Sequence, residues 1–182
     1  MEVNSDEDLM EQICQQRHEA FTVLVRRHTD KYYSLAYRVL GDRGDAEDVV
    51  QEAFLRIWRK SGMWNRRKMT KFTTWFYRIT LNLALDYKKK RKPILVDNLL
   101  EIPTENPDRI EILKNLEQQR QLEKAIRLLP ERQQTALNLC FYEELSNKEA
   151  AMIMGISLKA LQSLLMRGKS ALKKELKLEG AL

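Results

Sequence analysis

The sequence has few of the residues that interrupt helices and no run long enough to cross a membrane. Its 182 residues include only six glycines and four prolines, and long stretches are rich in the residues that favour helices. No apolar run approaches the roughly 18 residues of a membrane-spanning helix. The first residues are acidic, unlike the basic start of a signal peptide. These features predict an all-α, cytoplasmic protein without membrane insertion.

Cysteine and histidine are also scarce, with two of each. Cys14 and Cys140 lie in apolar helical patterns without a CxxC or Cys/His cluster, so we expect buried free thiols rather than a disulfide or metal site. His18 and His28 lack ligand spacing and are expected to be structural or on the surface. The sequence has no glycine-rich phosphate loop, GxSxG or HExxH. It therefore predicts a protein that is not an enzyme and has no metal or other cofactor.

Charge is unevenly distributed along the chain, within a net charge of +6. Residues 64–92 carry ten basic side chains and one acidic one, Asp86, and residues 156–182 carry six basic and two acidic ones. The segment 93–117 between them is acidic. Two separate basic segments suggest a polyanionic partner, although solvated lysine-rich helix faces give the same pattern.

Helical periodicity divides the chain into two parts. Two helices are predicted between Ser5 and Tyr37, a strongly amphipathic one over residues 46–60, and another from Phe72 to Lys92, where Pro93 should stop it. Residues 93–111 contain three of the four prolines and no sustained period, which marks a linker. We expect two helical domains, residues 1–92 and 112–182, joined by this flexible linker.

The C-terminal part contains the signals of a helix-turn-helix. Ser146 and Glu149 form a capping-box pattern, and Gly155 followed by Ser157 gives a stop and a new helix start. The helix at 157–174 is then expected to turn its leucines, Leu158, Leu161, Leu165 and Leu172, towards the core. Six of the side chains expected to project outwards suit base edges and phosphates: Lys159, Gln162, Ser163, Met166, Arg167 and Lys169. The alternative is an ordinary amphipathic surface helix.

The basic segment 64–92 interleaves aromatic and cationic side chains. Exposed aromatics can stack on unpaired bases while cations follow the backbone, so single-stranded DNA is a plausible ligand. The alternative is that individual aromatics belong to the core, as expected for Trp75 and Ile79, whereas Trp64 and the loop cations are better ligand candidates. Asn82, among apolar neighbours, is either a base reader or a packing residue with a satisfied amide.

Four motifs occur in the order and spacing of bacterial sigma factors of the extracytoplasmic-function (ECF) type, which the chain resembles over nearly its whole length. They are DAEDVVQEAF from Asp45, FTTWFYRITLN from Phe72, LPERQ from Leu129, and the helix-turn-helix. The resemblance implies that the polar stripe Asp48, Gln51 and Glu52, otherwise an ordinary solvated face, binds the β′ clamp helices of core RNA polymerase. It assigns minus-10 DNA recognition and melting to Trp64, Arg66, Lys71, Trp75, Arg78, Asn82 and Lys88. It assigns minus-35 duplex recognition to Lys148, Lys159, Gln162, Ser163, Met166, Arg167 and Lys169.

The resemblance also implies further partners: the β flap of the polymerase, promoter DNA and an anti-sigma factor that masks the binding faces. Gly168 stands where the family usually has alanine, a change expected to cost about 1 kcal/mol of helix propensity. The alternative function is a stand-alone helix-turn-helix regulator that binds duplex DNA without polymerase.

Overall fold

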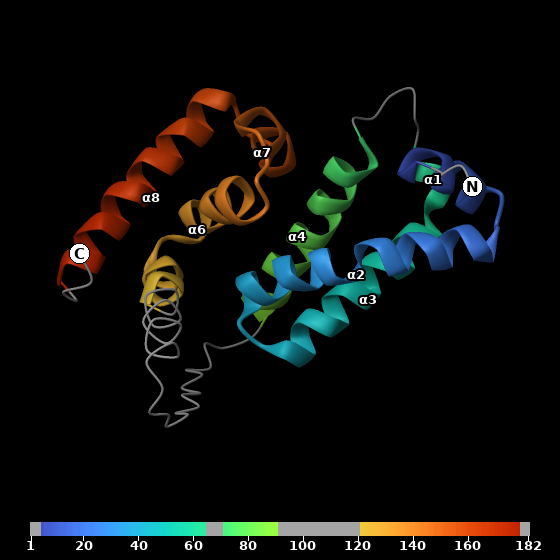
Figure 1. Ribbon diagram of the computed structural model, residues 1–182, viewed down its shortest axis with the longest axis horizontal. Helices are drawn as coiled ribbons and strands as arrows, with labels where there is room; N and C mark the ends of the chain where they lie inside the picture. Colours follow the sequence, from blue (N-terminus) through green and yellow to red (C-terminus); the bar gives the residue numbers. More distant parts are fainter. Residues whose placement is uncertain (1–4, 65–70, 91–120, 179–182) are drawn as a thin grey trace, which may run out of the picture. The chain divides into compact units, whose positions relative to one another are not determined.

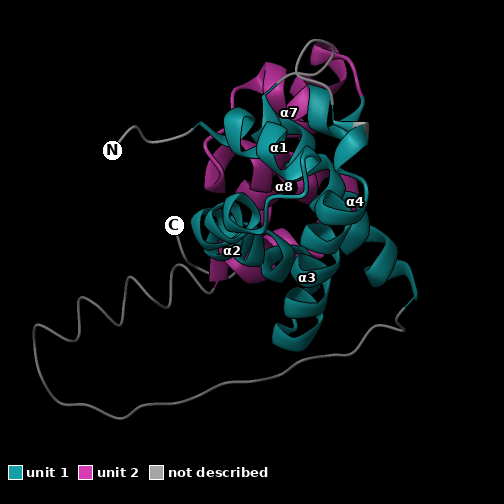
Figure 2. Ribbon diagram, turned by 90° about the vertical axis from the view of Figure 1, so that its right-hand side faces the viewer, with its two compact units in different colours: residues 1–94, 152–155 teal, residues 95–151, 156–182 magenta. Residues whose placement is uncertain are grey.

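The computed structural model describes residues 5–64, 71–90 and 121–178, and every regular element in these ranges is helical. The chain divides into two compact units, residues 1–94 with 152–155 and residues 95–151 with 156–182 (Figure 2). The predicted all-α fold is confirmed. The predicted linker, residues 93–111, lies outside the described residues.

The described residues before position 91 form four α-helices, which Figure 1 labels. They are α1 (Asp6–Cys14), α2 (His18–Leu40), α3 (Arg43–Arg59) and α4 (Phe72–Lys90). The long helix α2 packs against the other three, α3 also packs against α4, and α1 contacts α4. A short 3₁₀ turn, Ser61–Met63, follows α3 and contacts α1.

Local sequence signals set the ends of these helices. Helix α1 begins with a capping box in which the Ser5 hydroxyl accepts the amide of Asp8 at 3.1 Å and Asp8 accepts the amide of Ser5 at 3.2 Å. Helix α2 ends at Gly41, whose φ of 77° is left-handed and suits glycine. The side chain of Asp42 then caps α3 by accepting the amide of Asp45 at 2.9 Å.

Aromatic rings fill the core between α2, α3 and α4. Phe76 lies at its centre, with ring centroids 4.2 Å from Tyr32, 4.8 Å from Phe54 and 5.5 Å from Phe72. Tyr77 packs on the other side of Tyr32 at 4.9 Å. Rings at these separations contribute attraction beyond the area that they bury. The aromatic residues of α4 therefore mainly hold the unit together.

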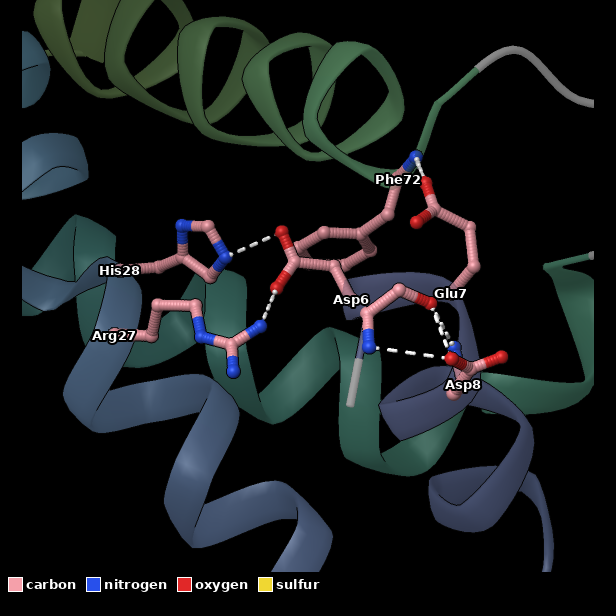
Figure 3. Close-up of polar contacts among 7 residues, drawn as sticks. Asp6, Glu7, Asp8, Arg27, His28 and Phe72 are labelled. Atoms are coloured by element: carbon pink, nitrogen blue, oxygen red, sulfur yellow. Dashed lines mark hydrogen bonds and ion pairs between the residues drawn. The ribbon is translucent and has the colours of Figure 1, made fainter. Parts of the chain in front are cut away.

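A partly buried ionic contact joins α1 to α2 (Figure 3). The Asp6 carboxylate lies 2.6 Å from Arg27 Nη1 and 2.8 Å from His28 Nε2. Burial works to raise the pKa of Asp6, but the hydrogen bonds and positive charges of His28 and Arg27 outweigh it and hold the pKa below its usual 3.8. The predicted structural role of His28 is confirmed, since the residue is 7% exposed and its ring packs on Tyr32 and Phe72.

The described residues from 121 onwards form a helical segment at 121–128, followed by α6 (Glu131–Leu137), a π-helical turn (Asn138–Tyr142), α7 (Asn147–Met154) and α8 (Leu158–Leu178). The sequence did not predict the π turn. Helix α6 packs along α8. Their shared core is made of small and branched apolar side chains: Ala125, Ile126, Leu129, Ala136, Leu137, Leu139, Ala150, Ala151, Leu161 and Leu165.

Gln134 fixes the bend at Pro130, where the helical segment 121–128 gives way to α6. Its amide nitrogen donates to the carbonyl of Arg127 at 2.8 Å and to that of Leu129 at 2.6 Å. The last carbonyls of a helix have no partner within the helix, so this side chain satisfies two acceptors that the bend would leave open.

Gly168 lets α8 lie unusually close to α6. A Cβ atom at this position would stand 3.0 Å from Cδ1 and 3.4 Å from Cγ of Leu137, which is itself 2% exposed. The glycine therefore has a packing role in addition to the helix-propensity cost expected from the sequence.

Candidate nucleic-acid interface

The polar stripe on α3 lies on the surface, as the amphipathic pattern predicts. Val49, Ala53 and Ile57 are buried on the opposite face. Asp48 and Gln51 are exposed, and Glu52 has a side chain 42% exposed. Helix α4 touches the stripe at one end, where the Tyr87 hydroxyl donates to Asp48 at 3.2 Å.

Glu52 accepts a hydrogen bond from Arg56 Nε, one helical turn away, at 2.9 Å. Both side chains are more than 40% exposed, so solvent screens the pair and either charge can exchange its partner at little cost. The stripe therefore presents carboxylate and amide groups that remain available to another protein.

Trp64, one of the predicted minus-10 residues, lies in the interior of the first unit. Trp64 is only 6% exposed, and Phe72, Phe76 and Tyr77 are fully buried. Their position between cations in the sequence suggested a binding surface, but packing of α1, α2 and α3 around α4 covers them. Arg66, another minus-10 candidate, lies outside the described residues.

Other candidates of the basic segment form one continuous surface row, which begins at Lys71, immediately before α4, and continues along α4. Lys71, Trp75, Arg78 and Asn82 are spaced i, i+4, i+7 and i+11, which places them on the same side of a helix. Lys71, Arg78 and Asn82 are exposed and Trp75 is half-buried, with its ring 6.3 Å from that of Phe72. We call these four residues the α4 row.

Two further residues of α4 lie elsewhere than the sequence predicted. Lys88 is half-buried and falls on another side of the helix, apart from the α4 row. Ile79, expected in the core beside Trp75, is also only half-buried. Asn82 is exposed, so its amide does not require a partner inside the protein.

Helices α7 and α8 have the geometry of a helix-turn-helix. Their axes bend by 102° at the turn, within the range of this motif. Ser146 and Glu149 form the predicted capping box, with the Ser146 hydroxyl 2.7 Å from the Glu149 carboxylate. Gly155 takes a φ of 63° in the turn, and the Ser157 hydroxyl then accepts the amide of Ala160 at 3.2 Å.

Helix α8 displays its predicted reading face. Leu161 and Leu165 are buried against the unit, whereas Leu158, also expected inside, is 38% exposed because it begins the helix. Met166 is 67% exposed and Ser163 is half-buried. The remaining candidates are all exposed: Lys148 at the start of α7, and Lys159, Gln162, Arg167 and Lys169 on α8.

Lys169 stands at the edge of this face. Its ammonium lies 4.7 Å from the centre of the Phe141 ring in the π turn, and Phe141 is 52% exposed. An exposed cation–π contact of this kind stabilises by about 0.5 to 1 kcal/mol, so it orients the lysine without holding it away from a phosphate.

The cysteines differ from expectation. Cys14 is exposed and Cys140, in the π turn, is only partly buried. The residues that the structure describes contain no group of three His, Cys, Asp or Glu side chains placed to hold a metal ion. Among them, no single helix is both long and apolar enough to cross a bilayer; only the bent α7–α8 pair, taken together, reaches that length and composition.

Comparisons with known proteins match both units. Residues 24–94 match the family model of sigma-70 region 2, and residues 119–172 match that of sigma-70 region 4. The ECF RNA polymerase sigma factor SigW of Bacillus subtilis is 30% identical over 187 residues, covering 92% of this chain and 95% of SigW. The chain belongs to the ECF sigma factors. The sequence-based prediction of this family, whose members bring RNA polymerase to promoters, is confirmed.

Other ECF sigma factors are similarly related. SigE of Mycolicibacterium smegmatis is 36% identical over 154 residues, which cover 82% of this chain and 59% of SigE. The fold matches that of CnrH, solved with the cytosolic domain of CnrY, with a TM-score of 0.70 and 24% identity over 96% of this chain and 99% of CnrH. It also matches RpoE of Bartonella quintana, solved with the anti-sigma factor NepR, with a TM-score of 0.65 and 19% identity over 86% and 96% of the chains. Sigma factors are transcription initiation factors rather than enzymes.

Proposed function

We propose that this ECF sigma factor binds core RNA polymerase through α3, opens the minus-10 element with α4 and reads the minus-35 element with α8. The α4 row carries the proposal. A stand-alone duplex reader needs only the helix-turn-helix, whereas a row of lysine, tryptophan, arginine and asparagine suits a strand whose bases are unstacked. The protein itself catalyses no reaction and works in the cytoplasm, where polymerase and promoters are found.

The polymerase contacts follow from the chemistry of the exposed faces. Asp48, Gln51 and Glu52 offer acceptors and an amide to the β′ clamp helices, while the second unit binds the β flap. The proposed contacts with the clamp helices and with the flap both lie on exposed helix faces. A protein that covers these faces would therefore prevent the factor from binding polymerase. An anti-sigma factor is therefore the expected regulator, as the complexes of CnrH and RpoE illustrate for those proteins.

Reconstituted transcription tests this function. Core polymerase with the full-length protein is expected to give transcripts from a subset of fragments of the source genome, and core polymerase alone is expected to give none from them. Co-elution of the two proteins would accompany this activity. If no fragment yields a transcript that depends on the protein and the proteins do not co-elute, the proposal is wrong.

Two variants of α8 should separate base reading from phosphate binding. Lys169→Ala is expected to reduce the slope of log K against log salt by about 0.9, the value for one lost duplex phosphate contact, without changing the preferred sequence. Gln162→Ala should leave the slope unchanged and relax preference at one base pair, because its amide reads a base edge. Titrations of promoter duplexes at several salt concentrations measure both quantities.

The matched control for this pair is Lys124→Ala, which removes an exposed cation from the helical segment 121–128. Its slope should equal that of the unaltered protein. Identical slopes for Lys169→Ala and the unaltered protein would remove Lys169 from the phosphate contacts.

A further inference from the structure

Helix α1 holds both ends of the segment that joins α3 to α4. At the first end, the Cys14 thiol donates to the carbonyl of Ser61 at 3.2 Å. At the second end, the Glu7 carboxylate accepts the amide of Phe72, the first residue of α4, at 2.9 Å (Figure 3). These contacts join residues 47 and 65 positions apart in the chain.

The contact of Glu7 supplies what the start of α4 lacks. The first amides of a helix have no acceptor within the helix, and the helix dipole makes this end electropositive. The Glu7 carboxylate supplies both the missing acceptor and a negative charge that opposes the helix dipole. Glu7 thus fixes the direction in which α4 begins.

Glu7 is itself held firmly. The neighbouring Asp6 is bound to Arg27 and His28 of α2, and the His28 ring packs 5.6 Å from the ring of Phe72. On the other face of α1, Leu9, Met10 and Ile13 are buried in the core. The Glu7 carboxylate therefore belongs to a helix that is fixed both to α2 and to the core.

We propose that Glu7 is a positioning residue for promoter opening, which sets the first turn of α4 and with it Lys71 and Trp75 of the α4 row. This inference rests on the proposed role of the α4 row in binding opened DNA. Lys71 immediately precedes the capped amide, and its carbonyl accepts the amide of Trp75 at 3.3 Å. Loss of the cap would free this turn and misplace the residues that capture the unstacked strand, while α3 and α8 would keep their contacts.

The test uses full-length protein, core polymerase and a promoter with 2-aminopurine in the minus-10 element. Glu7→Ala is expected to slow opening by about fivefold to tenfold, consistent with loss of a charge-assisted hydrogen bond, while affinity for core polymerase stays within about twofold. Glu7→Gln keeps an acceptor oxygen at the same reach and should open within about twofold of the unaltered protein.

Two controls separate positioning from general destabilisation. Glu19→Ala removes an exposed acid from α2 and should open normally. Leu9→Ala weakens the packing of α1, and tryptophan fluorescence reports its folding because all three tryptophans lie before residue 76. At a temperature where this variant remains folded, it should open faster than Glu7→Ala.

Normal opening by Glu7→Ala would overturn the inference and leave the proposed function intact. A parallel loss of opening and core binding in Glu7→Ala and Leu9→Ala would also overturn it, since that pattern reflects only stability. If the unaltered protein binds core polymerase but opens no promoter, the proposed function fails and this inference fails with it.

Discussion

Replacing Gln51 and Glu52 together with alanine is expected to weaken binding to core RNA polymerase by roughly fiftyfold. A few central residues supply most of the binding energy of a protein interface, and two such truncations commonly cost between 2 and 3 kcal/mol, by order of magnitude about this factor. Fluorescence anisotropy of labelled protein titrated with core polymerase measures the change.

The fold should survive this double substitution. Gln51 is exposed, and the ion pair of Glu52 with Arg56 lies on the surface, where such pairs contribute less than about 1 kcal/mol. Binding of the variant to a minus-35 duplex should therefore remain normal, because α8 belongs to the other unit.

Arg56→Ala is the matched control, since it breaks the same ion pair and keeps both side chains proposed to bind polymerase. It should bind core polymerase within about threefold of the unaltered protein. Normal polymerase binding and transcription by the double variant would instead favour a stand-alone helix-turn-helix regulator.

Gly168→Val is expected to lower the free energy of unfolding of the second unit by about 2 kcal/mol, roughly a thirtyfold change in its folding equilibrium. Its Cβ would already be 3.0 Å from Leu137, and the two methyl groups of valine extend further into the packed contact between α6 and α8. Because the unit contains no tryptophan, hydrogen exchange of the α6 and α8 amides in urea is the suitable measurement.

Two further substitutions test whether the lost stability comes from the tight contact with Leu137. Ser170→Val places the same β-branched side chain at an exposed position of α8 and should change stability by less than about 0.5 kcal/mol. Gly168→Ala gains about 1 kcal/mol of helix propensity against a tight contact, so its net effect should be small. Equal stability of Gly168→Val and Ser170→Val would show that the close approach is unimportant.

The features predicted correctly from the sequence are those whose causes are local. Ser146 and Glu149 begin α7, because each acts on backbone groups within four residues of itself. The helix-turn-helix needs only such signals together with the leucine spacing of α8. The ECF resemblance added the grouping of polar residues on α3 that periodicity alone left as solvated surface.

The features that were missed depend on contacts between distant residues. Trp64 lies next to a basic loop in the sequence, and only the packing of the helices around it reveals that it is buried. The contact of Glu7 with Phe72 has no local signature, since the carboxylate resembles any other acid in the first turn of a helix. Gly168 was read through helix propensity alone, because its neighbour Leu137 lies in another helix.

The hydrogen bonds of Gln134 hold the bend before α6 without involving the exposed side chains of α8. The Gln134 amide binds two backbone carbonyls, which every amino acid provides, so the angle at Pro130 depends little on the identity of the residues around it. The exposed side chains of α8 can therefore change during evolution without moving the scaffold that presents them. Under the proposed reading of the minus-35 element by α8, single substitutions on this helix would give new promoter preferences, and such a factor could come to serve a different set of genes with the same fold.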